Sequence, residues 1–483
     1  MKTSKIAIGG IALLLLATSA AAVDTTPVFA GEGTTQEPFL IGTPAEFALA
    51  RDRIAAAESY KQNGKTLKYS AAAYRLTDFL DFGGEVTGTP FGTSANPFTG
   101  DFDGDGYTME YYSVVSSDAS VGVFGTLLGG CVHDLTLSNV AATLEVPASA
   151  TGKYAVGLLC GRVENATSKT TVSVERCTVE GTVTASSEVS GTEIDVGGMI
   201  GRLHSAGLSK KAVVCDGAAD ITVSATGGEK VTVVAGGVVG YAGNPDVLLK
   251  NLIASGSVNA VAKSRYKAFT GGIAGKVEAL VDESPWLASE AGIVSCFSDC
   301  AVTSSAGHGL KDVTEYEETM YNRGLICGFV QGRDEAPPVS VYTTRTDIST
   351  FNDSHSDGKT VSALNDTLWH DRLGFDTVSL WQSRPEKTPV LPRRAGLAGH
   401  RLSDGKSVMI TTHAGETTLA GTLVAVTYDA DGRLNGVQTR RAVLLGGYYS
   451  DTESFTFDTD ADVHVFFLPD DTFSPICRAL TVK

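Results

Sequence analysis

The chain has 483 residues with 55 acidic and 38 basic side chains, which gives a net charge of −17. This negative charge argues against a protein that binds nucleic acid or anionic membranes, because phosphate groups attract cationic surfaces. Eight cysteines are too few, in a chain of this length, for a small disulfide-stapled domain. The length allows two or three domains with a sizeable core.

The N-terminus has the pattern of an export signal. Lys2 and Lys5 precede an apolar stretch at residues 6–17, and small residues then offer two possible cleavage sites, after Ala22 or after Ala30. The apolar stretch is shorter than the roughly 20 residues that span a bilayer. We therefore expect residues 1–30 to be a signal peptide, and the mature chain to be extracellular with no membrane-spanning segment.

Residues 31–68 are predicted to form an N-terminal cap of one strand and one helix. The strand is FLI (39–41), and Thr43-Pro44-Ala45-Glu46 forms a capping box with proline at the first helical position. The helix is predicted to run to about Tyr60 and to bury one face, made by Phe47, Ala50, Ile54 and Ala57. Such a helix would cover the open end of a stack of strands.

A short apolar phrase between glycines returns six times along the chain. The six are VGVFG (121–125), VGLLCG (156–161), VGGMIG (196–201), AGGVVG (235–240), TGGIAG (270–275) and RGLICG (323–328). Their closing glycines are 35 to 40 residues apart, except for a last interval of 53. A period of this size is typical of architectures built from stacked repeats.

Between the phrases the chain is rich in short alternating runs such as TVSVE (171–175), ITVSA (221–225) and VTVVA (231–235). These runs predict an all-β fold, and specifically a right-handed parallel β-helix, or solenoid, over residues 69–392. A repeat of 35–40 residues is expected to hold about two coils. A β-propeller with one blade per repeat is the alternative, which we disfavour because the phrases lack aromatic blade signatures.

Two further segments follow the repeats. Residues 393–396, at the end of EKTPVLPRRAG (386–396), are predicted to be a linker. Residues 397–483 are predicted to form a small β-sandwich, with two strands around the turn YDADG (428–432) and further strands within 454–468.

The repeat region resembles the GLUG-type repeat proteins over roughly residues 36–392. The resemblance rests on the glycine phrases, on PFLIGTPAEF (38–47), on NPFTGDFDGDGYTM (96–109) and on the ending from Trp381 to Leu391. These relatives are exported bacterial proteins, often found in adhesins and beside immunoglobulin-A-protease domains. The resemblance implies a β-helix, export from a bacterium and adhesion or surface scaffolding, but no particular reaction. YDADGRLNGVQ (428–438) is similar to modules that end clostridial-type surface proteins.

Two candidate metal motifs are weak. DFDGDG (101–106) imitates the start of an EF-hand loop, but position 12 is Tyr112 where the loop needs glutamate, so we predict a tight turn. Cys296 and Cys300 form C-x3-C without a second ligand pair at zinc-site spacing. Cysteines recur after the glycine phrases at Cys177, Cys215 and Cys296, and we predict that these are buried core thiols.

Enzymatic motifs are also weak. None of the eight histidines is followed by glutamate, which excludes the H-E-x-x-H motif of zinc proteases. The long interval at residues 307–335 interrupts the period and carries several charged residues, among them Glu317 and Glu318. The enzymatic alternative is therefore a β-helix polysaccharide lyase or glycoside hydrolase with its site near 307–335.

We predict a non-catalytic binding, adhesion or scaffold protein that is secreted or held non-covalently at a bacterial cell surface. Its expected partners are a host glycan, the extracellular matrix or another surface protein, with nucleic acid excluded by the charge. The sequence nominates no catalytic, cofactor-binding or metal-binding residue, and it implies no cofactor.

Overall fold

The computed structural model describes residues 23–24, 29–165, 167, 171–205, 212–243, 247–263, 268–278, 292–306, 323–331, 340–346, 359–394, 396–402, 404–413, 419–429, 431, 433–444, 450–457, 461–470 and 480–482. Almost all of the predicted signal peptide and most of the interval 307–335 lie outside these residues. The structure is built mainly of β-strands, which confirms the all-β class.

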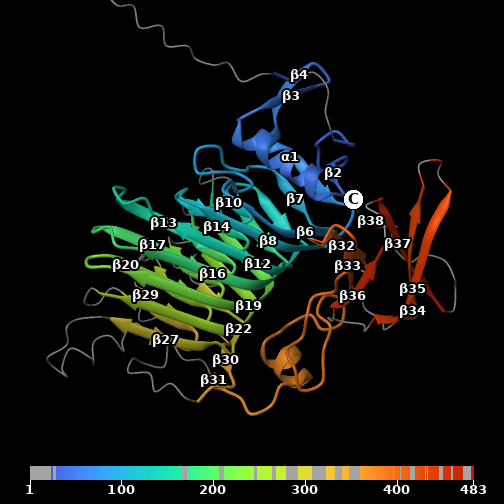
Figure 1. The fold of residues 1–483 in the computed structure, drawn as a ribbon. Helices are drawn as coiled ribbons and strands as arrows, with labels where there is room; N and C mark the ends of the chain where they lie inside the picture. The colour runs from blue at the N-terminus through green and yellow to red at the C-terminus, as the bar shows by residue number, and fades with distance from the viewer. Residues whose placement is uncertain are drawn as a thin grey trace, which may run out of the picture.

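The glycine repeats form three sheets of parallel strands (Figure 1). The first small sheet holds the strand that enters each glycine phrase: β9 (Ser120–Val121), β13 (Gly152–Gly157), β17 (Thr192–Gly197), β20 (Thr232–Gly236), β23 (Ala268–Gly271) and β28 (Arg323–Gly324). The second small sheet holds the strand that leaves it: β10 (Phe124–Leu128), β14 (Cys160–Glu164), β18 (Ile200–His204), β21 (Val239–Gly243), β24 (Ala274–Glu278) and β29 (Cys327–Gln331).

The large sheet collects the remaining strands of the repeats. Its sixteen strands are β2 (Phe39–Ile41), β5 (Ala73–Leu76), β6 (Leu80–Thr87), β7 (Asp101–Asp103), β8 (Thr108–Ser116), β11 (Cys131–His133), β12 (Thr136–Glu145), β15 (Val172–Glu175), β16 (Thr178–Ser187), β19 (Ala212–Gly227), β22 (Val247–Ala262), β25 (Gly292–Val294), β26 (Phe297–Ser298), β27 (Ala301–Ala306), β30 (Tyr342–Thr343) and β31 (Lys359–Thr360). Every pairing within this sheet is parallel.

Each strand pairs with its counterpart one repeat further along the chain. Cys160 lies opposite Ile200, and Thr178 lies opposite Ala218, so the offset between partners equals the spacing of the phrases. One repeat therefore adds one layer to each sheet, and the expectation of two coils per repeat is wrong. The physical reason is the glycine phrase, where the chain folds into an arch of two strands joined by buried residues such as Leu158. The residues of this arch are the ones that the expectation had assigned to a second coil of the same repeat.

The closing glycine of an arch is required by a close approach of two backbones. A Cβ atom at Gly161 would lie 2.3 Å from the nitrogen of Val121, and one at Gly201 would lie 2.4 Å from the nitrogen of Val156. Real Cβ atoms essentially never approach other atoms within 3.0 Å. The backbone here does not adopt a left-handed φ, so the requirement is for space. The repeated glycines in the sequence thus mark where successive repeats touch.

The predicted helix is present as α1 (Pro44–Ala55). The capping box is confirmed: the Thr43 hydroxyl accepts a hydrogen bond from the Glu46 amide at 3.2 Å. The Glu46 carboxylate reaches back to the amide of Gly42 at 2.8 Å. The helix ends before the predicted limit at Tyr60, because Ala57 adopts a left-handed φ of 56°. The chain then enters an antiparallel hairpin of β3 (Ser59–Gln62) and β4 (Lys65–Lys68), with β1 (Val23–Asp24) beside β3.

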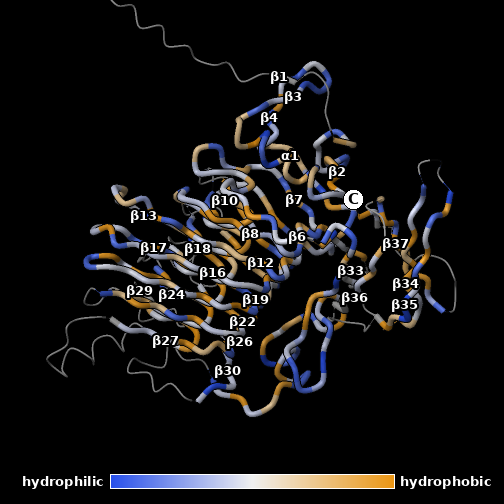
Figure 2. The backbone as a smooth tube through the Cα atoms, in the orientation of Figure 1, coloured by the Kyte–Doolittle hydropathy of each residue, from blue (hydrophilic) through white to orange (hydrophobic). Residues whose placement is uncertain are grey.

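Helix α1 lies at the end of the stack near β2 (Figure 1). Phe47 packs against Phe82 and Phe91 with ring centroids 5.6 and 5.1 Å apart, and this aromatic group continues through Tyr74 to the short helix η1 (Tyr69–Ala71). From there one connected core of buried side chains extends through the repeats. Figure 2 shows the apolar residues along the strands of this stack. The expectation of a helix at the end of the stack is therefore confirmed.

The C-terminal part contains two antiparallel sheets that share one core. One sheet consists of β32 (Gly396–Arg401), β33 (Ser407–His413) and β36 (Ser450–Thr456), and the other of β34 (Leu419–Tyr428), β35 (Leu434–Leu444), β37 (Val463–Pro469) and β38 (Leu480–Val482). Buried side chains from both sheets, including Ile410, Leu423 and Val465, form a single cluster. Strand β32 also contacts β6 of the large sheet.

Residues 381–394, here called the strap, run across the exposed face of the large sheet. The strap begins in a small aromatic core of Trp369, Phe375 and Trp381 next to the helical turn η2 (Thr367–Arg372). A bridge between Gln382 and Val390 folds it into a narrow hairpin. Three contacts fasten it to three layers: Trp381 Nε1 to Asp216 at 3.2 Å, Arg393 to Glu180 at 2.6 Å, and Arg394 to Asp105 at 2.8 Å. The predicted linker 393–396 thus starts with two residues that are bound to the stack.

Candidate functional site

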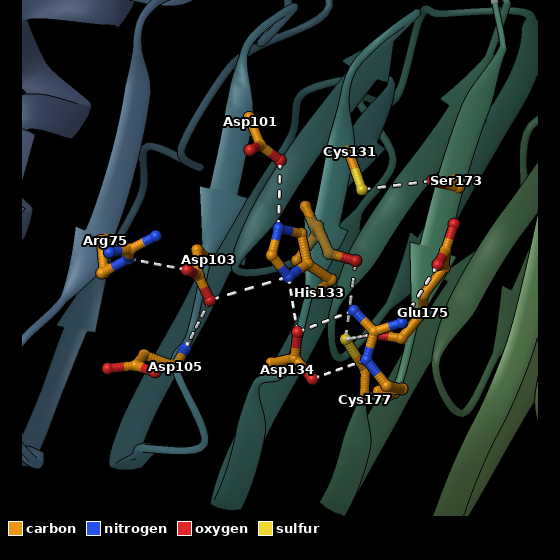
Figure 3. A network of polar contacts seen from close by, with 12 residues as sticks. Arg75, Asp101, Asp103, Asp105, Cys131, His133, Asp134, Ser173, Glu175 and Cys177 are labelled. Carbon is orange, nitrogen blue, oxygen red and sulfur yellow. Dashed lines mark hydrogen bonds and ion pairs between the residues drawn. The ribbon is translucent and has the colours of Figure 1, made fainter. Parts of the chain in front are cut away.

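Three neighbouring strands of the large sheet gather ionisable side chains on one face. Cys131 of β11 lies opposite Asp101 of β7, and His133 lies opposite Asp103. Because alternate residues of a strand point to the same side, these four side chains share one face of the sheet. Figure 3 shows Asp101 and Asp103 directed at the ring of His133, while the Cys131 thiol contacts the hydroxyl of Ser173 at 3.2 Å. We call this group, with its arginine partners, the His133 network.

Both ring nitrogens of His133 lie against carboxylates. Nε2 is 3.3 Å from Asp101 Oδ1, while Nδ1 is 2.6 Å from Asp134 Oδ2 and 3.6 Å from Asp103 Oδ1. Burial alone would lower the pKa of His133, but its hydrogen bonds to Asp101 and Asp134 raise it to about 10. The ring is therefore an imidazolium that donates from both nitrogens at neutral pH. In this state it has no lone pair with which to act as a base.

Two arginines complete the His133 network. Arg176 donates to both carboxylate oxygens of Asp134 at 2.6 and 2.8 Å, and Arg75 donates to Asp103 at 2.7 Å. Burial would raise the pKa of Asp134, but the bonds from His133 and Arg176 hold it well below its usual range. Arg176 also binds Glu175 at 3.2 Å, so three cations face four carboxylates. The network carries a net negative charge and joins successive layers of the large sheet.

The same residues include two groups whose donor atoms are close enough for a metal ion. These groups are Asp101, Cys131 and His133, and Asp103, His133 and Asp134, with the donor atoms of each within 4.8 Å of one another. A metal would need a neutral imidazole and a thiolate. The pKa of His133 is about 10, and burial raises the pKa of the Cys131 thiol to about 12. In the second group, Arg176 already binds Asp134 and Arg75 already binds Asp103, so both carboxylates are engaged by cations of the chain itself.

The DFDGDG segment forms the turn that the sequence predicts. Asp101 and Asp103 lie in β7, the Asp103 carboxylate accepts the amide of Asp105 at 2.8 Å, and Tyr107 bonds back to Gly104 at 2.8 Å. What the sequence reading missed is that two of these aspartates face His133. The segment CVHD (131–134) has the same alternation as DFD, and this similarity was the available signal.

The prediction of core thiols is confirmed for two of the three cysteines. Cys177 and Cys296 are fully buried and occupy the same position of their layers, where the two intervening layers have Gly217 and Leu252. Cys215 is the exception: it lies two residues earlier, opposite Glu175, and is only half-buried. The prediction fails there because repeats of unequal length shift the alignment. All seven cysteines within the described residues are free thiols.

A second buried polar group lies between the two small sheets. Asp195 of β17 and Arg202 of β18 face each other across one arch and form an ion pair, and Glu193 bonds the same guanidinium at 2.9 Å. The Asp195 side chain has no solvent exposure, and burial raises its pKa to about 7 although Arg202 opposes this. The Arg202 guanidinium stacks 3.8 Å from the ring centre of Tyr241 in the next layer. This pair fills the space inside the arch.

A pocket of about 270 Å³ lies between the strap and strands β16, β19 and β22. Its floor carries Glu180 and Asp220, which are register partners on adjacent strands, and Ser255, which donates to Asp220 at 3.0 Å. The strap contributes Arg384 and Arg393. Glu180 is also bound by the hydroxyl of Ser138 at 3.1 Å. We call this hollow the strap pocket.

The predicted enzymatic region at 307–335 falls mostly outside the described residues, and so do Glu317 and Glu318. Within the described part of that interval, Arg323 and Gly324 form β28 and residues 327–331 form β29. The structure shows convergent carboxylates beside basic residues in the His133 network and in the strap pocket, and both come from other parts of the chain.

The chain has a partial match among known proteins. No family model matches the chain. One segment is 31% identical over 179 residues to Halomucin of Haloquadratum walsbyi, and the match covers 34% of this chain. The match spans only 2% of the length of that protein. Among the described residues, no helix has the length and apolar character needed to cross a lipid bilayer.

Proposed function

We propose that the protein is an exported, non-catalytic surface protein of the GLUG-repeat type, secreted or held non-covalently at the bacterial cell surface. Its repeats form a parallel β-helix that serves for binding, adhesion or scaffolding, and its two C-terminal sheets form a β-sandwich. The helix is right-handed because crossovers between parallel strands have this hand in about 98% of cases.

The observation that carries this proposal is the constant register of the small sheets. In the second small sheet, which runs from β10 through β14, β18, β21 and β24 to β29, each strand pairs with the next at the same position of the glycine phrase. Each layer thus rests on its neighbours, as in other repeat proteins that present extended binding surfaces. The His133 network and the pair of Asp195 with Arg202 join charged groups between or within layers. A rigid stack of this kind is suited to displaying a binding surface.

A polysaccharide-degrading enzyme is the second candidate, and the strap pocket favours it. Glu180 and Asp220 stand on adjacent layers beside two arginines, and pairs of carboxylates carry out glycoside hydrolysis. However, one oxygen of Glu180 accepts from Arg393 and the other from Ser138. Both oxygens are therefore occupied in fastening the strap and linking layers, which favours the non-catalytic function.

Binding and cleavage can be tested on the same sample. The chain without residues 1–30 would be applied to arrays of immobilised glycans and extracellular-matrix proteins, and incubated in parallel with polysaccharides to detect new reducing ends. We expect binding without release of reducing ends. Release that disappears in Glu180→Gln or Glu317→Gln, and persists in the exposed control Glu188→Gln, would replace the proposal with the enzymatic function. Failure to bind any glycan or matrix protein would contradict it as well.

A further inference from the structure

We propose that the strap pocket binds one uncharged sugar unit. The inference rests on the proposed binding function and gives it a location and a class of ligand. It uses the outer face of the large sheet, far in sequence from the interval 307–335 that the glycine period singles out.

The pocket is formed in advance by contacts that do not involve a ligand. Trp381 anchors one end of the strap through Asp216, and Arg393 anchors the other through Glu180. Arg384 braces the hairpin between these ends by donating to the carbonyl of Thr388 at 2.9 Å. A hollow that is already shaped costs a ligand little reorganisation, which is the general reason why preorganised sites bind.

The charges around the pocket cancel. Glu180 and Asp220 provide two carboxylates, and Arg384 and Arg393 provide two guanidinium groups. This balance gives no net attraction for an anion or a cation. An uncharged ligand with several hydroxyl groups fits better, since each hydroxyl both donates and accepts hydrogen bonds. Asp220 is exposed at the floor and offers an acceptor for such a group.

The remaining lining matches the other features of a sugar ring. Ser255 and Thr388 add hydroxyl groups on opposite sides. Pro389, together with Ile253 and Leu391, which are 3% and 5% exposed, adds a small apolar area for the C–H face of the ring. The volume of about 270 Å³ is just below the range of roughly 300–1,000 Å³ that holds drug-sized ligands. The pocket therefore has room for one sugar unit of a glycan, with further units extending into solvent.

The test measures binding of five named sugars to the chain without residues 1–30 by saturation-transfer NMR titration. The probes are glucose, galactose, mannose and N-acetylglucosamine, which are uncharged, and glucuronic acid, which is anionic. Two variants alter the pocket: Asp220→Ala removes the exposed acceptor and Ser255→Phe fills the hollow. Thr222→Ala is the matched control, because Thr222 is exposed two residues after Asp220 on the same strand and does not line the pocket.

We expect at least one uncharged sugar to bind saturably, with a dissociation constant on the order of 1 mM or lower. Its affinity should fall at least about tenfold in both pocket variants, as loss of one hydrogen bond allows, and remain unchanged in Thr222→Ala. Thermal unfolding establishes that each variant is folded. Hydrogen exchange provides a second readout, since the bound sugar should slow exchange at the amide of Gln382, which bonds to Val390 across the strap.

Three results would overturn the inference: no saturable binding by any of the four uncharged sugars, preference for glucuronic acid, or binding that survives both pocket variants with no slowing at Gln382. The last result, together with a positive glycan array, would leave the proposed function standing and place its site elsewhere. If the array detects no binding, both the proposed binding function and the sugar site in the strap pocket are contradicted.

Discussion

Replacing His133 by glutamine should change how the stability of the protein depends on pH. Glutamine retains an amide that can donate to Asp101 or Asp134 but carries no charge. In the wild-type protein the folded pKa of His133 is about 10, above its ordinary value of 6.5. A raised pKa stabilises the folded state fully below the unfolded value, and the contribution is lost as the pH rises toward 10. The variant lacks this dependence.

The size of this change in stability follows from the difference between the folded and unfolded pKa values of His133. One pH unit between the two pKa values corresponds to at most about 1.4 kcal/mol. The side chain of His133 is only 20% exposed, so solvent screens the interaction weakly. Between pH 6.5 and 8.0 we expect the wild-type free energy of unfolding to fall by about 1–2 kcal/mol relative to the variant. Asp134 stays ionised in this range, because its hydrogen bonds to His133 and Arg176 hold its pKa well below the usual value. Most unfolded thiols titrate only above this range.

The measurement is urea unfolding of wild-type and His133→Gln protein at pH 6.5, 7.0, 7.5 and 8.0, followed by circular dichroism. The destabilisation caused by the substitution should be greatest at pH 6.5 and shrink toward pH 8.0. Parallel curves for the two proteins over this range would refute the reasoning, because they would mean that His133 is not held as an imidazolium by its carboxylates.

Three further predictions concern the stack. Gly201→Ala should destabilise the stack by about 3 kcal/mol or more, because the backbone must move to make room for the new Cβ. The control is Gly88→Ala, whose new Cβ meets nothing closer than 3.7 Å and which should cost under about 1 kcal/mol. Thermal unfolding of the two variants measures the difference. Asp195→Ala should cost about 3 kcal/mol in urea unfolding, the low end for a broken buried pair, because Glu193 still binds Arg202; an unchanged midpoint would contradict this. The seven described thiols should react with a disulfide reagent at pH 8 at least about 100 times more slowly in the folded than in the unfolded protein. The reason is that burial raises their pKa values. Equal rates in the two states would show that the thiols are accessible and would contradict the prediction.

Local patterns in the sequence were sufficient for the elements and the repeat. The glycines at Gly161 and Gly201 mark a close approach of backbones that recurs in every layer, so their spacing predicted the parallel stacking. Thr43 and Glu46 form a cap through contacts within four residues, which the sequence displays directly. What the period could not indicate is how many strands one repeat contains, because the arch at Leu158 is formed by buried packing rather than by a turn motif.

The candidate sites depend on contacts between distant residues. Arg393 and Glu180 are separated by 213 positions, and nothing near either residue indicates the other. His133 meets Asp101 only because β7 and β11, which lie before and after the first glycine phrase, become neighbours in the large sheet. Cys215 illustrates the same limit on a smaller scale, since layers of unequal length moved it two residues from the position that its neighbours suggested.

The most direct test is a crystal structure of the chain without residues 1–30, soaked with the uncharged sugar that binds most tightly. We predict one sugar ring between Asp220 and Thr388, beneath a strap in which Arg393 still contacts Glu180. A sugar bound at another site, or a strap separated from the large sheet, would contradict the proposal that this surface is where the protein binds.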